Sequence, residues 1–208
     1  MLSKLKKLKE RLVTRLDPDE EAFNKVYPVI NTVEGFLKSP KQEKWFFKAA
    51  RQAPHNAVIV EIGSFKGRST VSFGFGCSGT QKHIYAIDLF EGDGADYGDG
   101  DFQKIFQSNI DRCGLTNYIT SIKKHSSIVA SSWEKPIDIL FIDGSHEYQD
   151  VKNDFEAFYP HVKKNGIIAF HDIRGKWDGV IQFWNEVQQA GYLKDIGQVS
   201  SLGFGRKK

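Results

Sequence analysis

The segment that decides the fold is VIVEIGSFKGRST, residues 58–70. It starts as a short apolar run rich in β-branched residues, which is typical of a strand buried on both faces. After the acidic Glu61, Gly63 and Gly67 allow a tight turn and a close backbone approach. Ser69 and Thr70 then lead into a helix. The segment therefore predicts a strand, a glycine turn and a helix.

Three known glycine loops compete for this turn. A phosphate-binding Walker loop needs G-x-x-x-x-G-K-[ST], but here the glycines are one residue closer together and Arg68 replaces the lysine. The dinucleotide fingerprint G-x-G-x-x-G also differs from the observed G-x-x-x-G, which Glu61 precedes. The third form, E-x-G-x-x-x-G, suits a cofactor that carries an adenosine but no phosphates. A plain strand-to-helix turn without a ligand stays open as an alternative.

A second apolar strand, HIYAID at residues 83–88, also ends in an acid, Asp88, 27 positions after Glu61. A carboxylate at the end of the second strand of a βαβ unit can accept hydrogen bonds from both hydroxyls of a ribose. Asp88 is therefore a candidate ribose ligand, and a surface turn acid is the alternative.

From residue 57 onward, strand and helix patterns alternate. We expect strands near 57–62, 83–88, 118–123, 137–142 and 166–171, and helices near 68–77, 101–112, 126–132, 147–159 and 178–189. A final β-hairpin follows from Tyr192, with Gly197 near its turn and Ser201 in its last strand. The fold class is thus α/β, a Rossmann-like, doubly wound, mostly parallel seven-stranded sheet with a C-terminal hairpin. Residues 57–208 would form this domain, and residues 1–56 a helical extension, with Asp17 and Pro18 at one helix start.

Composition excludes several classes of protein. The chain has 208 residues, a net charge of +3, two cysteines without a paired motif, and no apolar run long enough to cross a membrane. No signal peptide is apparent, so we expect a cytoplasmic, reducing location. We expect no nucleic-acid partner, because no basic groove interleaved with aromatic residues is present.

The basic charge is concentrated at the start of the chain. Residues 2–16 place leucines at helical spacing among six Lys and Arg residues, which predicts a basic amphipathic helix. Such a helix could touch an anionic membrane surface peripherally or bind an acidic partner. It could also pack on its own domain or on a second copy in a homo-oligomer.

An acidic glycine-rich loop, residues 91–101, follows the second strand. Its spacing lacks the twelve-residue register of an EF-hand. We expect a lid beside the cofactor, with a solvated loop as the alternative, and Asp101 as a cap of the next helix.

A second group of reactive side chains follows the later strands. FIDGSH, residues 141–146, ends a buried strand in Asp143, and the strand near 166–171 ends in His171 and Asp172. Ligands bind at the carboxyl ends of parallel strands, so these side chains should converge with Glu61 and Asp88. Asp143, His171 and Asp172 could hold Mg²⁺ or another divalent cation, or could cap helices without a metal. His146 could take a proton from an acceptor hydroxyl, or serve only as a structural hydrogen bonder.

Together, VEIGSFKGRST (60–70), AIDLFEG (86–92), FIDGSHEY (141–148) and AFHD (169–172) resemble the class I S-adenosylmethionine-dependent methyltransferases. Within them the chain is most similar to the macrocin-type sugar O-methyltransferases and cephalosporin-hydroxylase-like proteins. The resemblance covers roughly residues 57–205.

The resemblance implies roles for the matched positions. The cofactor-binding set would be Glu61, Gly63, Ser64, Phe65, Gly67, Ser69, Asp88, Leu89, Ser126 and Asp143. Asp143 and His146 would be catalytic, and Asp143, His171 and Asp172 would bind the metal. His125 departs from the family's usual acid, His171 from its usual acid or amide, and His146 stands where catechol-type enzymes carry a lysine.

The implied activity is S-adenosylmethionine-dependent O-methylation of a sugar or other polyhydroxylated small molecule, with or without a divalent metal. Two alternatives stay open. One is a metal-dependent, hydroxylase-like relative, and the other is a non-catalytic cofactor-binding or membrane-associated accessory protein.

Overall fold

The computed structural model describes residues 17–91 and 101–208. The basic amphipathic helix predicted at 2–16 and most of the acidic lid predicted at 91–101 lie outside these residues. Among the helices that are described, none is both long enough and apolar enough to span a bilayer.

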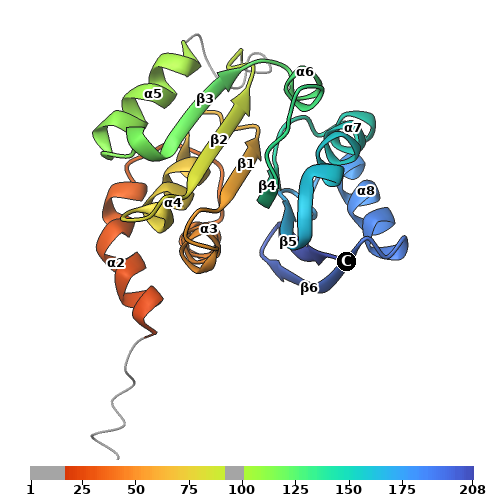
Figure 1. Cartoon of the computed structure of the whole chain (residues 1–208), viewed down its shortest axis with the longest axis horizontal. Helices are drawn as coiled ribbons and strands as arrows, with labels where there is room; N and C mark the ends of the chain where they lie inside the picture. Colours follow the sequence, from red (N-terminus) through yellow and green to blue (C-terminus); the bar gives the residue numbers. More distant parts are fainter. Residues whose placement is uncertain (1–16, 92–100) are drawn as a thin grey trace, which may run out of the picture.

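Seven strands form one sheet in the order β3-β2-β1-β4-β5-β7-β6 (Figure 1). The parallel strands are β1 (Val58–Ile62), β2 (His83–Asp88), β3 (Ile119–Lys123), β4 (Ile137–Ile142) and β5 (Val162–Phe170). The antiparallel strands β6 (Leu193–Val199) and β7 (Leu202–Lys207) complete the sheet, with β7 beside β5. The predicted fold class is confirmed.

Helices cover both faces of the sheet (Figure 1). One face carries α2 (Pro18–Ile30), α3 (Lys41–Gln52), α4 (Arg68–Cys77) and α5 (Phe102–Arg112). The other carries α6 (Ser126–Ala130), α7 (Tyr148–Phe158) and α8 (Asp178–Gln189). Short 3₁₀ turns, η1 (Thr116–Tyr118) and η2 (Tyr159–His161), precede β3 and β5. Each face of the sheet forms a hydrophobic core with the helices that cover it, and neighbouring strand residues point to opposite cores. Ile59 lies in the core beneath α2 to α5, and Val60 lies in the core beneath α6 to α8. Strand β1 is therefore apolar throughout except at Glu61.

The helices before residue 57 share a core with the sheet. The ring of Phe46 in α3 lies 4.8 Å from that of Phe73 in α4 and 4.7 Å from that of Phe141 in β4. The predicted helix cap at Asp17 is confirmed, because its carboxylate accepts a hydrogen bond from the Asp19 N–H. Residues 31–40 lie within the segment predicted to be helical, but they form a connection without a helix. The division of the chain at residue 57 stays a prediction.

Two strand boundaries differ from the prediction. The hairpin turn lies at Ser200 and Ser201, not near Gly197, which sits inside β6. A Cβ on Gly197 would lie 2.6 Å from the ring of Phe204, so this glycine allows close cross-strand packing instead of a turn. Strand β5 also begins four residues early, where Lys163 forms an ion pair with Asp138 of β4 at 2.8 Å.

Candidate active site

The carboxyl ends of β1, β2, β4 and β5 meet at one edge of the sheet, and the reactive side chains predicted from the sequence lie there. Gly63, after β1, shows how closely these ends approach. A Cβ on this residue would lie 2.0 Å from the backbone oxygen of Asp143, after β4. Gly63 has φ +82° and Gly67, the cap residue of α4, has φ +92°, so both need the freedom of glycine.

Glu61 lies fully buried beneath this glycine loop. Its Oε2 accepts hydrogen bonds from the hydroxyls of Thr70 and, at 3.1 Å, of Ser64. Burial outweighs these hydrogen bonds and raises the pKa of Glu61 to about 7. Among the described residues, Glu61 Oε1 is one of two buried side-chain oxygens that lack a hydrogen-bond partner. Ser69, also predicted to contact the cofactor, is buried in the first turn of α4.

Asp88 anchors the glycine loop as well as ending β2. Its Oδ2 accepts hydrogen bonds from the backbone N–H groups of Ser64 at 2.6 Å and Phe65 at 2.8 Å, and its Oδ1 accepts one from Phe90 at 2.6 Å. The sequence pattern predicts an acidic residue at the end of β2, but it does not predict that Asp88 binds the backbone of the glycine loop. Leu89, the next residue, is exposed beside it.

Three residues at this edge hold left-handed backbone conformations that disfavour side chains. Phe65 has φ 47°, Phe90 φ 53° and Asp172 φ 54°, and each follows a strand end. Such conformations cost free energy and often occur at functional sites.

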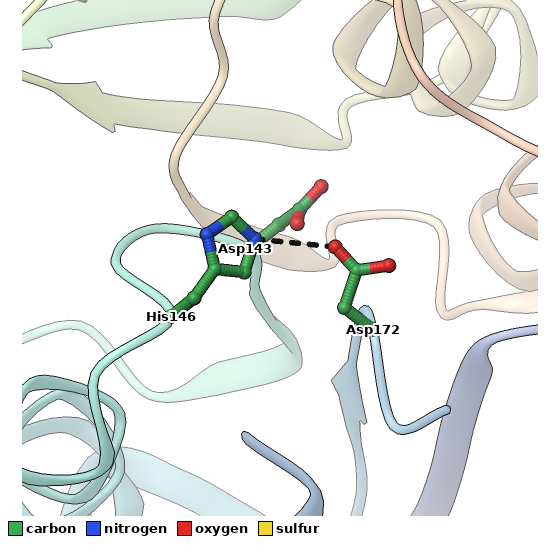
Figure 2. A group of neighbouring side chains, drawn as sticks. All are labelled: Asp143, His146 and Asp172. Atoms are coloured by element: carbon green, nitrogen blue, oxygen red, sulfur yellow. Dashed lines mark hydrogen bonds and ion pairs between the residues drawn. The ribbon is translucent and has the colours of Figure 1, made fainter. Parts of the chain in front are cut away.

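Asp143, His146 and Asp172 form a cluster at the ends of β4 and β5 (Figure 2). One ligand atom from each lies within 4.8 Å of the other two, and His146 Nε2 is 3.2 Å from Asp172 Oδ2. All three side chains are about one-fifth exposed. Two carboxylates and an imidazole are a donor set that suits a divalent cation.

His171 lies beneath this cluster and is 5% exposed. Its Nδ1 is 3.2 Å from both Asp143 Oδ1 and Asp172 Oδ2. Burial alone would lower the pKa of His171, but the two carboxylates outweigh it and raise the pKa to about 10. Burial would raise the pKa of Asp172, yet hydrogen bonds from His146 and His171 hold it well below its usual range. The structure thus places His146, and not the predicted His171, in the accessible group of candidate ligands.

Two residues that sequence reasoning missed support this cluster. Gln42 of α3 is buried and places its Oε1 3.4 Å from His171 Nε2, while its Nε2 donates to Ser201 Oγ at 3.1 Å. Trp177 stacks on His146, with ring centroids 3.8 Å apart and an angle of 11° between the planes. Trp177 could have been noticed as an aromatic five residues after Asp172, whereas Gln42 gives no local signal.

Ser126 lies farther along the same edge, at the start of α6. Its hydroxyl is buried and donates a hydrogen bond to Asp154 of α7, which the sequence did not single out. Burial raises the pKa of Asp154 to about 6, even though the hydrogen bond opposes this shift. His125 caps α6 through its Nδ1, which accepts from the Ser127 N–H at 3.3 Å.

Comparisons with known proteins agree with this architecture. A family model described as a methyltransferase domain matches residues 60–173. The uncharacterized protein y4gI of Sinorhizobium fredii is 27% identical over 135 residues, which are 62% of this chain and 15% of that protein. This chain covers only 15% to 55% of the length of three curated relatives that it matches.

Solved structures share the fold at low sequence identity. An O-methyltransferase from Bacillus cereus in complex with SAH superposes with a TM-score of 0.65 at 16% identity, covering 100% of both chains. CalS11, a TDP-rhamnose 3'-O-methyltransferase, superposes with a TM-score of 0.59 at 16% identity, covering 94% of this chain and 97% of that one.

The family match spans more than half of the chain and includes the glycine loop, Asp88, Asp143 and Asp172. This chain therefore belongs to the methyltransferase-domain family.

Proposed function

We propose that this protein transfers a methyl group from S-adenosylmethionine to a hydroxyl of a sugar or other polyhydroxylated small molecule. The observation that supports this most is the Asp143, His146 and Asp172 cluster beside the glycine loop. This cluster offers groups that can take a proton and oxygen ligands at the position where the hydroxyl substrate would meet the methyl donor. The name of CalS11 adds a sugar precedent within the same fold.

The residues at the sheet edge suit the parts of S-adenosylmethionine. Glu61 Oε1, which is buried without a partner among the described residues, would be satisfied by a cationic amino group near the glycine loop. Asp88 and Leu89 would lie along the ribose, and Ser126, with Asp154 behind it, along the adenine. Gly63, Ser64, Phe65, Gly67, Ser69 and Asp143 would complete the cofactor-binding set.

The chemistry of the site follows from these positions. When bound, S-adenosylmethionine would supply the methyl group of its sulfonium, and the electron pair of the broken carbon–sulfur bond would stay on the sulfur. His146 would take the proton of the attacking hydroxyl on its imidazole, and Asp172 would stabilise the imidazolium. Asp143 would orient the acceptor hydroxyl.

A divalent cation would fit the same cluster. Asp143, His146 and Asp172 could hold it, with His171 beneath them, and it would lower the pKa of a coordinated hydroxyl. Methyl transfer that continues at full rate in excess chelator would remove the metal from the proposal.

Calorimetry with S-adenosylmethionine tests the cofactor site. We expect the wild type to bind and Asp88→Ala to bind at least tenfold more weakly, because the glycine loop loses its anchor. Asp111→Ala, which removes exposed hydrogen bonds from Gln107 and Thr116 near the end of α5, is the matched control and should bind normally. If the wild type does not bind at millimolar cofactor, the proposal is wrong.

Release of S-adenosylhomocysteine tests the acceptor. TDP-rhamnose serves as a sugar probe and catechol as an aromatic vicinal diol. We expect His146→Ala to retain cofactor binding and to lose transfer. Transfer to catechol alone would contradict the sugar class but leave O-methylation in place.

We further propose that residues 1–16 contact an anionic membrane surface or a second copy of the chain. Their six basic residues and helical leucine spacing support this. Flotation with phosphatidylserine vesicles, compared with and without residues 2–16, would show no difference if the membrane contact is wrong.

A further inference from the structure

The indole of Trp177 covers one face of the His146 imidazole. The rings are nearly parallel, with centroids 3.8 Å apart and planes inclined by 11°. His146 lies in the loop after β4, and Trp177 lies in the loop between β5 and α8. The side chain that faces the candidate acceptor position is therefore held by a residue from a different loop.

The two loops are also packed together through their backbones. A Cβ added to Gly179, in the first turn of α8, would lie 2.4 Å from Tyr148 N and 2.5 Å from His146 O. Such contacts leave no room for any side chain, so the start of α8 lies directly against the backbone that carries His146. Trp177 and His146 are thus fixed relative to each other at two levels, side chain and backbone.

Without this stack, His146 would be weakly restrained. Its side chain is 21% exposed, and its Nε2 lies 3.2 Å from Asp172 Oδ2. One such contact fixes a single ring atom and leaves the imidazole free to turn about it. The parallel indole prevents this rotation, because it fixes the plane of the imidazole ring.

We propose that Trp177 is a positioning residue that holds the imidazole of His146 in the plane required to face both Asp172 and the acceptor. This inference rests on the proposed role of His146 as the proton acceptor. A group held in reacting geometry raises the rate of transfer and not the affinity for substrate. Loss of the indole should therefore lower kcat while KM stays nearly constant.

The test compares four variants of the full chain. Trp177→Ala removes the stack and Trp177→Phe restores an aromatic face. Lys176→Ala is the matched control, because Lys176 Nζ lies 4.5 Å from the centroid of the same indole, yet its loss leaves both stacked rings in place. Gly179→Ala separates the two loops without changing either ring. Calorimetry with S-adenosylmethionine confirms that each variant keeps its cofactor site.

The first readout needs no acceptor. In spectra of protein labelled at histidine, a ring stacked on an indole has its carbon-bound protons shifted upfield by the ring current. We expect the His146 signals, assigned with His146→Ala, to move downfield in Trp177→Ala and Gly179→Ala. They should stay in place in Lys176→Ala and move only partly in Trp177→Phe. Signals that do not move in Trp177→Ala would overturn the inference.

The second readout is methyl transfer to TDP-rhamnose or catechol, whichever is the better acceptor. We expect kcat to fall at least tenfold in Trp177→Ala and to recover in Trp177→Phe. Wild-type kcat in Trp177→Ala would overturn the positioning role. If His146→Ala keeps full activity, the proposed role of His146 is wrong instead, and the histidine spectra still decide whether the stack exists.

Discussion

Asp154 illustrates how a single buried carboxyl sets a pH dependence. It is 7% exposed, and its side chain accepts a hydrogen bond from the hydroxyl of Ser126. Its pKa of about 6 in the folded protein exceeds the value of 3.8 expected in the unfolded chain. The folded state therefore binds more protons between these two values, and stability is lost as pH rises through this window.

We predict that Asp154→Asn removes this pH dependence. The wild type should lose up to about 3 kcal/mol of unfolding free energy between pH 4 and pH 7 relative to the variant, since one pKa unit corresponds to about 1.36 kcal/mol. Urea titrations at several pH values measure the difference. Parallel pH profiles for the two proteins would contradict the assignment of this shift to Asp154.

At the scale of elements, Arg68 joins the glycine loop to the N-terminal helices. Its guanidinium donates to Glu43 of α3 at 2.8 Å, to the Val33 carbonyl at 2.7 Å and to Ser39 Oγ at 2.7 Å. Glu43 is fully buried, so Arg68 compensates its charge. Arg68, which stands where a Walker loop has its lysine, thus connects residues 31–43 to the start of α4.

We predict that Arg68→Ala destabilises the fold by about 3 to 5 kcal/mol, because it leaves a buried carboxylate without its partner. Arg112→Ala is the matched control: this exposed arginine reaches the same connection through Thr32 Oγ1, and its loss should cost less than about 1 kcal/mol. Chemical denaturation followed by circular dichroism measures both. Equal losses of unfolding free energy in the two variants would show that the buried charge of Glu43 does not cause the destabilisation.

The elements show which features a sequence can predict. Alternating apolar strands predict the sheet, and the rule that parallel strands end at one edge predicts that Asp143, His171 and Asp172 lie together, as they do. Gln42 and Trp177 were missed because their roles depend on tertiary contacts and not on spacing. The hairpin turn was misplaced because Gly197 serves packing against Phe204, which a propensity for turns does not reveal.

For the whole molecule, the shared aromatic core makes the first helices part of the folded unit. Phe46 of α3 packs against the rings of both Phe73 and Phe141, so this helix contributes directly to the core beneath the sheet. Gln42 of the same helix reaches His171 beneath the candidate active site. The sequence pattern changes at residue 57, but the hydrophobic core is continuous across this position.

We predict that residues 17–208 fold and bind S-adenosylmethionine like the full chain, whereas residues 57–208 do not fold cooperatively. The shorter fragment would expose the apolar face that α2 and α3 cover. Thermal unfolding followed by circular dichroism distinguishes the two. A cooperative transition for residues 57–208 at the melting temperature of the full chain would contradict this view.

The left-handed backbone at Phe65, Phe90 and Asp172 has a consequence for how this protein can change. Glycine would relieve a conformational penalty of about 1 kcal/mol at each position, but it would also remove the side chain. Phe90 is buried, with its ring 5.2 Å from that of Phe106, so its loss would cost about 3 to 5 kcal/mol. At Asp172, glycine would remove the carboxylate that pairs with His146 and His171. Laboratory evolution for heat tolerance should therefore keep these side chains and place glycine at the exposed left-handed positions Asn165 and Ser200.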